Sequence, residues 1–163
     1  MSYIELGSLC KFRNENTPID RNTYVSTESM LPNKAGITQP SSVPRNGKAR
    51  AFRRGDTLIS NIRPYFKKIW QADYDGCCSA DVLVFQPISC DADYLYWLLS
   101  DDDFFDYVVA TSKGTKMPRG DKKAIMHFHT KEMRAESQKH IASVLNPIRQ
   151  LIRLNNRLND YLA

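Results

Sequence analysis

Residues 55–87 read GDTLISNIRPYFKKIWQADYDGCCSADVLVFQP, and this segment decides the fold that the sequence predicts. Apolar and polar residues alternate through Leu58, Ser60 and Ile62, and two further apolar runs follow. Gly-Asp and Asp-Gly dipeptides punctuate the runs. Period-two patterning with such turns is typical of neighbouring antiparallel strands. We therefore predict an antiparallel β-scaffold, with a cationic and aromatic connection at residues 63–68.

Covering helices are predicted directly after this scaffold. Asp91 is placed to cap an apolar, helically periodic stretch that ends at Ser100. The acids at 101–103 begin a second helix, because negative charge is favoured in a first helical turn. A short strand is predicted at 124–129, where apolar residues alternate with histidines. The predicted fold class is therefore α/β (α+β), with a small twisted, mainly antiparallel β-sheet covered by helices.

The N-terminal part is predicted to be less regular. Residues 3–5 have the pattern of a short strand, and residues 6–12 that of a turn of helix. Residues 13–45 are polar and rich in turn-forming residues, with one strand-like piece at 23–26. Two interpretations fit this long loop. It is a functional loop anchored by the apolar residues spread through it, or it is a flexible surface loop.

The C-terminal segment forms a separate unit, because it contains no glycine and its apolar residues have helical spacing. We place the boundary between a β-rich domain at 1–131 and a helical unit at 132–163. Pro147 would interrupt one long helix, since proline lacks a backbone N–H and fits a first helical turn. Two helices that meet at a kink are therefore predicted, near 134–145 and 147–163.

A heptad stripe runs along this unit. Its polar member, Asn155, would fix register and partner at a cost in stability, as in a coiled-coil seam. Two interpretations are open: the stripe is a dimer interface, or it packs on its own domain. The candidate interface residues are Ile141, Val144, Ile148, Leu151, Asn155, Leu158 and Leu162.

Positive charge is segregated along the chain, which has a net charge of +5. Basic residues cluster at 45–54 and 113–123, and acids cluster at 91–106. Segregation of this kind predicts one electropositive face that contacts phosphates, although many surface lysines are simply solvated. Arginine can also bind guanine edges with two hydrogen bonds. The candidate DNA-binding residues are Arg45, Lys48, Arg50, Arg63, Tyr65, Lys67, Lys68, Lys113, Lys116 and Arg119.

Neither a catalytic nor a metal site is indicated. The four cysteines include no CxxC pair, so we expect reduced thiols rather than a metal site. No glycine-rich cofactor loop is present, and the Asn61–Tyr65 segment has one residue too many for the Asn-Pro-Pro-Tyr motif of DNA amino-methyltransferases. The carboxylates at 73–81 lack the spacing of a nuclease site. His127 and His129 are interpreted as a polar pair on one strand face.

No apolar run approaches the ~20 residues that a membrane-spanning helix needs. The N-terminus also lacks a basic region followed by an apolar one, so no secretory signal is evident. We therefore expect a cytoplasmic protein without a membrane partner.

Motifs in three regions of the sequence together carry a family resemblance. Residues 55–65 read Gly-Asp-x-Leu-Ile-Ser-x-Ile-Arg-Pro-Tyr, and residues 75–81 read Asp-Gly-x-x-Ser-x-Asp. A Gly-Thr-x-x-Pro-Arg loop is present at 114–119. The closing segment contains Ile-Ala-x-x-Leu at 141–145 and Leu-Asn-x-x-Leu-Asn at 154–159. In these motifs the sequence resembles one half of the specificity subunit of type I restriction–modification systems.

The resemblance implies a noncatalytic DNA-recognition component. Residues 1–131 would be a target recognition domain that binds one half of a bipartite target in the major groove of double-stranded DNA. The helices at 132–163 would pair antiparallel with partner helices as a spacer. Methyltransferase (modification) subunits would supply S-adenosylmethionine chemistry, and a restriction subunit would supply ATP- and Mg-dependent translocation and cleavage. No cofactor is expected in this chain.

Three alternatives remain at this point. The chain is a natural half-subunit that forms a homodimer, or it is part of a longer subunit with two recognition domains. It could instead be a stand-alone double-stranded-DNA-binding regulator without methyltransferase partners. A metal-dependent nuclease is the weakest of the competing hypotheses, because the carboxylate spacing does not support it.

Overall fold

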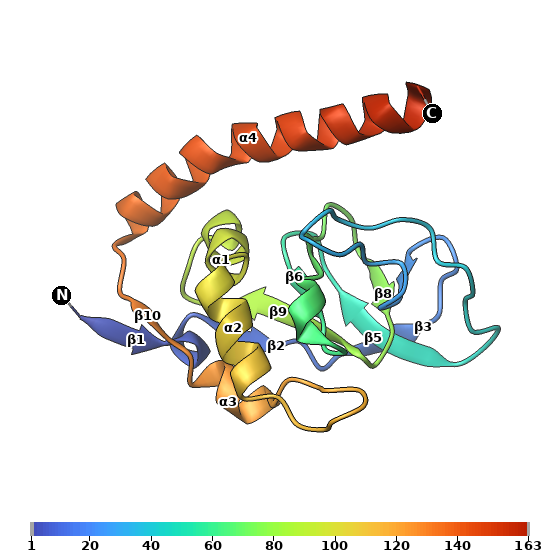
Figure 1. The fold of residues 1–163 in the computed structure, drawn as a ribbon, viewed down its shortest axis with the longest axis horizontal. Coiled ribbons are helices and arrows are strands. Elements are labelled where there is room, and N and C mark those ends of the chain that lie inside the picture. The colour runs from blue at the N-terminus through green and yellow to red at the C-terminus, as the bar shows by residue number, and fades with distance from the viewer. Residues whose placement is uncertain (1, 163) are drawn as a thin grey trace.

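The structure, a computed structural model, describes residues 2–162 and has three layers: helices, a central sheet and a second sheet (Figure 1). The central sheet has the order β2-β9-β6-β7, and all its pairs are antiparallel. Its strands are β2 (Cys10–Phe12), β9 (Val82–Pro87), β6 (Thr57–Ser60) and β7 (Ile69–Gln71). Three of the four come from the 55–87 segment, so the predicted antiparallel scaffold is confirmed.

A second four-stranded sheet was not predicted. It has the order β3-β5-β8-β4, and β4 and β8 form its one parallel pair. Its strands are β3 (Asn16–Pro18), β5 (Lys48–Phe52), β8 (Gly76–Cys78) and β4 (Tyr24–Val25). The scaffold is therefore two stacked sheets rather than one small sheet. Two short strands of the long N-terminal loop, β3 and β4, belong to the second sheet.

The central sheet is buried on both faces. Leu58, Trp70 and Val84 pack against the second sheet, in a cluster that also contains residues of β5 and β8. Ile59 and Phe85 point to the other face and pack against the helices. The second sheet excludes water from one face of β9, and the helices exclude it from the other. Side chains on both faces are therefore apolar, which explains the continuous run VLVF in place of strict alternation.

Helices α1 (Ala92–Leu99) and α2 (Asp102–Ala110) cover the central sheet, as predicted. Asp91 caps α1 by accepting hydrogen bonds from two backbone N–H groups of its first turn. Asp101 caps α2 in the same way through one N–H. These caps satisfy donors that have no partner inside a helix, which fixes where each helix begins.

The strand predicted at 124–129 is wrong. The segment begins with the helix α3 (Lys122–Met126), and the strand β10 (His129–Lys131) follows. Asp121 accepts hydrogen bonds from two backbone N–H groups and caps α3, so a local helical turn prevails over a six-residue alternation. The partner of β10 is β1 (Tyr3–Glu5), which lies at the other end of the sequence.

The two histidines of that segment do not share a strand face. His127 follows the last residue of α3, and its Nδ1 lies 3.1 Å from Oε1 of Glu5. His129 lies in β10. Each ring belongs to a different element, so they form no paired site.

The predicted helical turn at 6–12 is also only partly right. A 3₁₀ turn covers Leu6–Ser8, and the following residues form β2. That strand finds backbone partners in β9, whose position more than seventy residues later could not be inferred from local pattern.

The predicted break at Pro147 is wrong, because α4 (Ala135–Leu162) is one continuous helix. Figure 1 shows α4 arching over the rest of the molecule. Proline removes one hydrogen bond from the ladder, to the carbonyl of Ser143, and that loss bends a helix without always ending it. Residue 163, where the second helix was predicted to end, lies outside the described residues.

Across residues 2–162, no helix combines the length and the apolar character needed to cross a bilayer.

Candidate nucleic-acid interface

Two loops meet beyond the end of β6 and form one surface. The backbone N–H of Arg63 donates to the carbonyl of Pro118 at 2.8 Å. Lys113 and Arg119 exchange two backbone hydrogen bonds, of 2.8 and 2.9 Å, which close the second loop as a hairpin. A further bridge joins Ile62 to Arg119. We call residues 61–66 and 113–119 together the loop face.

Four of the predicted DNA-binding cations lie on the loop face. Arg63 and Lys116 are exposed, and neither forms an ion pair within residues 2–162. Arg119 has Nη2 3.2 Å from Oδ1 of Asp81, and Lys113 pairs with Asp121. The hydrogen bond from Lys113 lowers the pKa of Asp121. Pairs this exposed contribute little to stability, so a phosphate can replace the carboxylate at small cost.

An aromatic pair projects from the same surface. Tyr65 is 48% exposed and the neighbouring Phe66 is 39% exposed, with ring centroids 4.8 Å apart. Both lie on a 3₁₀ turn, η2 (Pro64–Phe66), between two residues with left-handed backbone, Arg63 and Lys67. Such conformations are uncommon outside glycine and tend to occur at functional sites. Exposed rings beside arginine and lysine are suited to stacking on nucleobases.

Arg50 of β5 lies next to the loop face. Arg50 donates from Nη1 to the carbonyl of Val82 at 3.0 Å. Because Asp81 is the adjacent residue, Arg50 and Arg119 reach the same turn. Lys48 is exposed at the start of β5, and Arg45 is exposed in the loop before it. The structure thus brings two of the predicted cations, Arg50 and Arg119, to one turn.

Lys67 and Lys68 have contacts inside the molecule instead. Nζ of Lys67 lies 2.9 Å from Oδ1 of Asp102, and Lys34 contacts the same oxygen at 2.8 Å. The two ammonium groups lower the pKa of Asp102 to about 2. Lys68 donates to the carbonyl of Thr27 at 2.7 Å, and burial lowers its pKa. These two lysines hold the long N-terminal loop and α2 to the scaffold.

Asp56, which the sequence assigns to a turn, forms a buried ion pair. Its carboxylate is bound by Arg13 through Nε at 2.7 Å and Nη2 at 3.1 Å. It also accepts the backbone N–H of Arg53 at 2.8 Å. Both charged side chains are almost fully buried. Arg13 was not predicted to be its partner, because it lies 43 residues earlier in the chain, directly after β2.

Gly76 is needed for close packing rather than for a special backbone angle. A Cβ at this position would lie 2.6 Å from the Phe52 ring and 2.7 Å from the carbonyl oxygen of Thr23. Any larger residue would push β8 away from its neighbours. The Asp-Gly motif at 75–76 therefore builds the second sheet, and contact with DNA is not needed to explain it.

The heptad stripe of α4 is exposed, and the opposite side of the helix faces the domain. At 3.6 residues per turn, Leu151 and Leu158 lie opposite Gln138 and Arg149. Gln138 and Ala142 are the buried residues of α4. Packing on its own domain therefore does not cover the stripe. The exposed fractions are 53% for Val144, 50% for Ile148, 60% for Leu151, 58% for Leu158 and 82% for Leu162, while Asn155 is exposed and Ile141 is half-buried.

Comparison with solved structures identifies the architecture. A chain from a study of complex assembly and conformational transition of the type I R-M system superposes with a TM-score of 0.70 at 21% identity. The alignment covers 99% of this chain and 45% of that chain. The chain has the fold of one half of a type I restriction–modification S subunit. The predicted fold class is confirmed by this match.

Two further S subunits share the half-subunit fold. The HsdS subunit from Thermoanaerobacter tengcongensis matches with a TM-score of 0.67 at 20% identity, over 98% of this chain and 45% of that one. The S subunit from M. genitalium matches with a TM-score of 0.59 at 15% identity, over 98% and 44%. The chain thus spans less than half the length of these S subunits. By sequence, no protein-family model and no curated protein matches it.

The part of the chain that the structure describes contains no group of three or more histidine, cysteine or acidic side chains placed to hold a metal ion. Exposed cations and aromatic rings placed side by side, as on the loop face, are suited to phosphate neutralisation and ring stacking.

Proposed function

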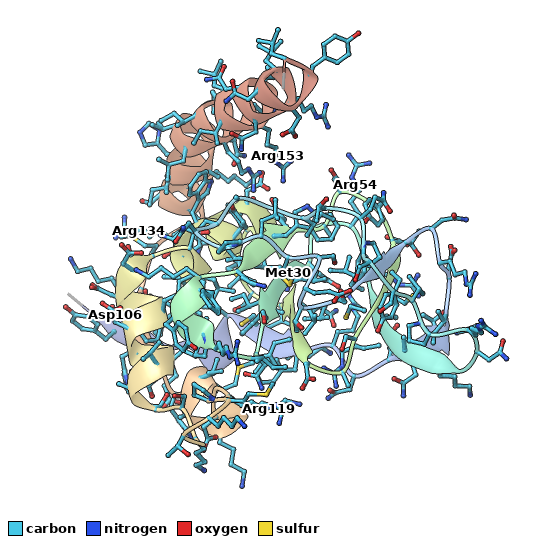
Figure 2. All side chains as sticks on the ribbon, turned by 45° about the vertical axis from the view of Figure 1, so that its right-hand side comes forward. Met30, Arg54, Asp106, Arg119, Arg134 and Arg153 are labelled. Atoms are coloured by element: carbon cyan, nitrogen blue, oxygen red, sulfur yellow. The ribbon has the colours of Figure 1, made fainter. Side chains whose placement is uncertain are left out.

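We propose that this chain is the noncatalytic specificity component of a type I restriction–modification system and recognises one half of a bipartite DNA target. The observation that carries the proposal is the loop face, where exposed cations and an aromatic pair are presented on the fold of half an S subunit. Figure 2 places Arg119 on the edge of the domain across from α4 and its Arg153. The proposed DNA surface and the helix proposed to bind partners would therefore be separate.

The chemistry of the loop face suits duplex DNA. Arg63 and Lys116 have no carboxylate partner among residues 2–162, so they can neutralise phosphates directly. The backbone hydrogen bonds between the two loops fix where these charges stand, which limits the entropy lost on binding. Base choice would come from side chains that enter the groove, and arginine offers two donors to guanine.

The division of labour follows the predicted domains. Residues 1–131 would recognise DNA, and the helical unit at 132–163 would act as spacer and dimer interface. Its exposed stripe fits the same stripe of a second copy, or the equivalent helix of a second half, paired antiparallel. Methyltransferase and restriction subunits would bring S-adenosylmethionine, ATP and Mg, so this cytoplasmic component would need no cofactor of its own.

Duplex DNA selected from a random library by the purified chain tests the proposal. We expect enrichment of a defined motif, and binding that weakens steeply as salt rises because condensed counterions are released. Binding that is insensitive to salt, or selection that yields no motif, would contradict it.

A stand-alone DNA-binding regulator is the second candidate, because a second copy alone could cover the exposed stripe of α4. Co-purification from cells that encode the chain separates the two. A methyltransferase subunit retained with the chain supports the specificity role, and a homodimer without one supports the regulator.

A further inference from the structure

Helix α4 is attached to the domain mainly by hydrogen bonds. It lies mainly against α1, where Ala142 is the one apolar residue of α4 that is buried. The next docking residues toward the C-terminus are Asn146 and Arg149. We call these two residues, with Asp93, Trp97 and Gln71 of the domain, the latch.

Asn146 uses both ends of its amide in the latch. Its Nδ2 donates to Oδ2 of Asp93 at 2.8 Å. Its Oδ1 accepts the indole Nε1–H of Trp97 at 3.0 Å and Nη2 of Arg149 at 3.2 Å. These bonds have preferred directions, so they fix the rotation of α4 as well as its distance from α1.

Arg149 links α4 to the central sheet. Its Nη1 donates to Oε1 of Gln71, at the end of β7, at 2.7 Å. Gln71 is buried and is itself held by a bond from Nε2 to the carbonyl of Ala92 at 3.1 Å. The guanidinium of Arg149 lies 4.5 Å from the ring centroid of Tyr96 and 5.6 Å from that of Trp97. A planar group that bonds and stacks at once cannot be replaced by lysine.

The latch lies where the helix is weakest. Pro147 stands between the two latch residues of α4 and removes a ladder hydrogen bond there. Beyond Arg149, no hydrogen bond or ion pair joins α4 to the domain within residues 2–162. A cavity of about 570 Å³ separates the end of α4 from Ile37 and Trp70 of the domain. The direction of the whole distal half therefore depends on the latch.

We propose that Asn146 and Arg149 are positioning residues that set the angle between the recognition domain and the spacer helix, and thereby the spacing between two half-sites. The part of this inference that concerns half-site spacing rests on the proposed function, and the part that concerns the angle does not. The angle itself is a property of the isolated chain. In a dimer built through the distal half of α4, a change of angle at the latch moves each loop face relative to the other.

The first test measures the angle without DNA. Spin labels are attached to cysteines at Asp106 on α2 and Tyr161 on α4, both exposed, in a Cys90→Ser background because the other cysteines are buried. Labelled chain is diluted with unlabelled chain so that distances within one copy dominate. A narrow distance distribution is expected for the parent. Asn146→Ala and Arg149→Ala should broaden and shift it.

Matched variants test whether a broader distance distribution comes from loss of the latch contacts or only from loss of charge. Arg153→Ala removes the same charge one turn later, where no bond joins the helix to the domain, and should leave the distribution narrow. Arg149→Lys keeps the charge but loses the planar guanidinium, so its distance distribution should be as broad as that of Arg149→Ala. If circular dichroism shows that Arg149→Ala does not fold, the distance distribution of Asn146→Ala alone tests the proposal. An unchanged distribution in the folded latch variants would overturn the proposal.

The second test uses duplexes in which the two half-sites are separated by different numbers of base pairs. The parent should prefer one spacing by about tenfold, and Arg149→Ala should reduce that preference to about twofold while half-site affinity stays unchanged. An undiminished preference would overturn the spacing role. If the parent binds no DNA, the proposed function fails, while the distance measurement still decides whether the latch sets the angle.

Discussion

The 55–87 segment and helix α4 are held to the molecule in different ways. Strands of the segment are buried on both faces and anchored by the Arg13–Asp56 ion pair. Helix α4 is held by a few polar contacts and keeps an apolar stripe in solvent. The first region is covered on both faces within this chain, whereas the apolar stripe of the second is left uncovered. Substitutions of buried residues in the segment should therefore act on folding, and substitutions in the stripe of α4 on assembly.

The largest expected effect lies in the buried pair. Asp56→Ala removes the buried partner of the Arg13 guanidinium and leaves it only the exposed Glu15, so it should lower the free energy of unfolding by about 3 kcal/mol. Urea unfolding followed by circular dichroism measures this.

Two variants serve as controls for the buried pair. Asp75→Ala removes an exposed carboxylate from the next turn and should have a much smaller effect. The double variant Arg13→Met with Asp56→Asn should be more stable than the sum of its parts, because no charge is left unpaired. An unchanged free energy of unfolding in Asp56→Ala would contradict the difference proposed between the two regions.

The stripe of α4 should show the opposite behaviour. Leu151→Asp removes an exposed leucine, so the unfolding midpoint of dilute protein should stay nearly unchanged. Self-association should weaken by about 2 kcal/mol per leucine that becomes buried between helices. Sedimentation equilibrium over a concentration series measures the dimer constant, with Gln150→Asp as control. A parent that stays monomeric at every concentration would refute the dimer interface.

A smaller effect is expected on the loop face. Lys116→Ala should weaken DNA binding similarly for all sequences and lower the slope of log K against log salt by about 1, as for loss of one phosphate contact. Fluorescence anisotropy with labelled duplex measures this. Lys139→Ala, an equal charge change on α4, should leave the slope unaltered. Equal effects from both lysines would mean that binding follows net charge rather than the loop face.

The smallest effect concerns pH. The pKa of Asp102 is lowered to about 2, so its ionised form is favoured in the folded state. Its contribution to stability is therefore present above the ordinary value of 3.8 and is lost as pH falls toward 2. NMR signals of Asn33, whose N–H donates to the carbonyl of Phe66, should report the loosening. Asp102→Asn should abolish this titration, and a titration that persists would assign it elsewhere.

Local patterns were sufficient for much of the fold. The strands of the 55–87 segment and the two helices with aspartate caps depend on alternation, turns and capping within a few residues, so sequence predicts them well. The second sheet and the pairing of β1 with β10 depend on segments far apart in the chain, which no local pattern reveals. The break predicted at Pro147 was wrong because contacts of α4 with the domain on both sides of the proline keep the helix continuous.

The candidate site also has a part that local sequence predicts and a part that depends on contacts between distant residues. Arg63 and Lys67 look alike in the sequence, since both belong to one cationic connection. The contacts that distinguish them come from Asp102 and Pro118, many residues away. Composition therefore predicted a basic surface. Which cations face solvent and which hold the fold together was decided by tertiary contacts.

The central claim is that this chain supplies DNA specificity to a methyltransferase. Mapping methylated bases in the genome that encodes it, with and without its gene, tests that claim most directly. We predict that methylation of one bipartite motif disappears with the gene and returns when the gene is restored. Methylation that is unchanged at every motif would contradict the claim.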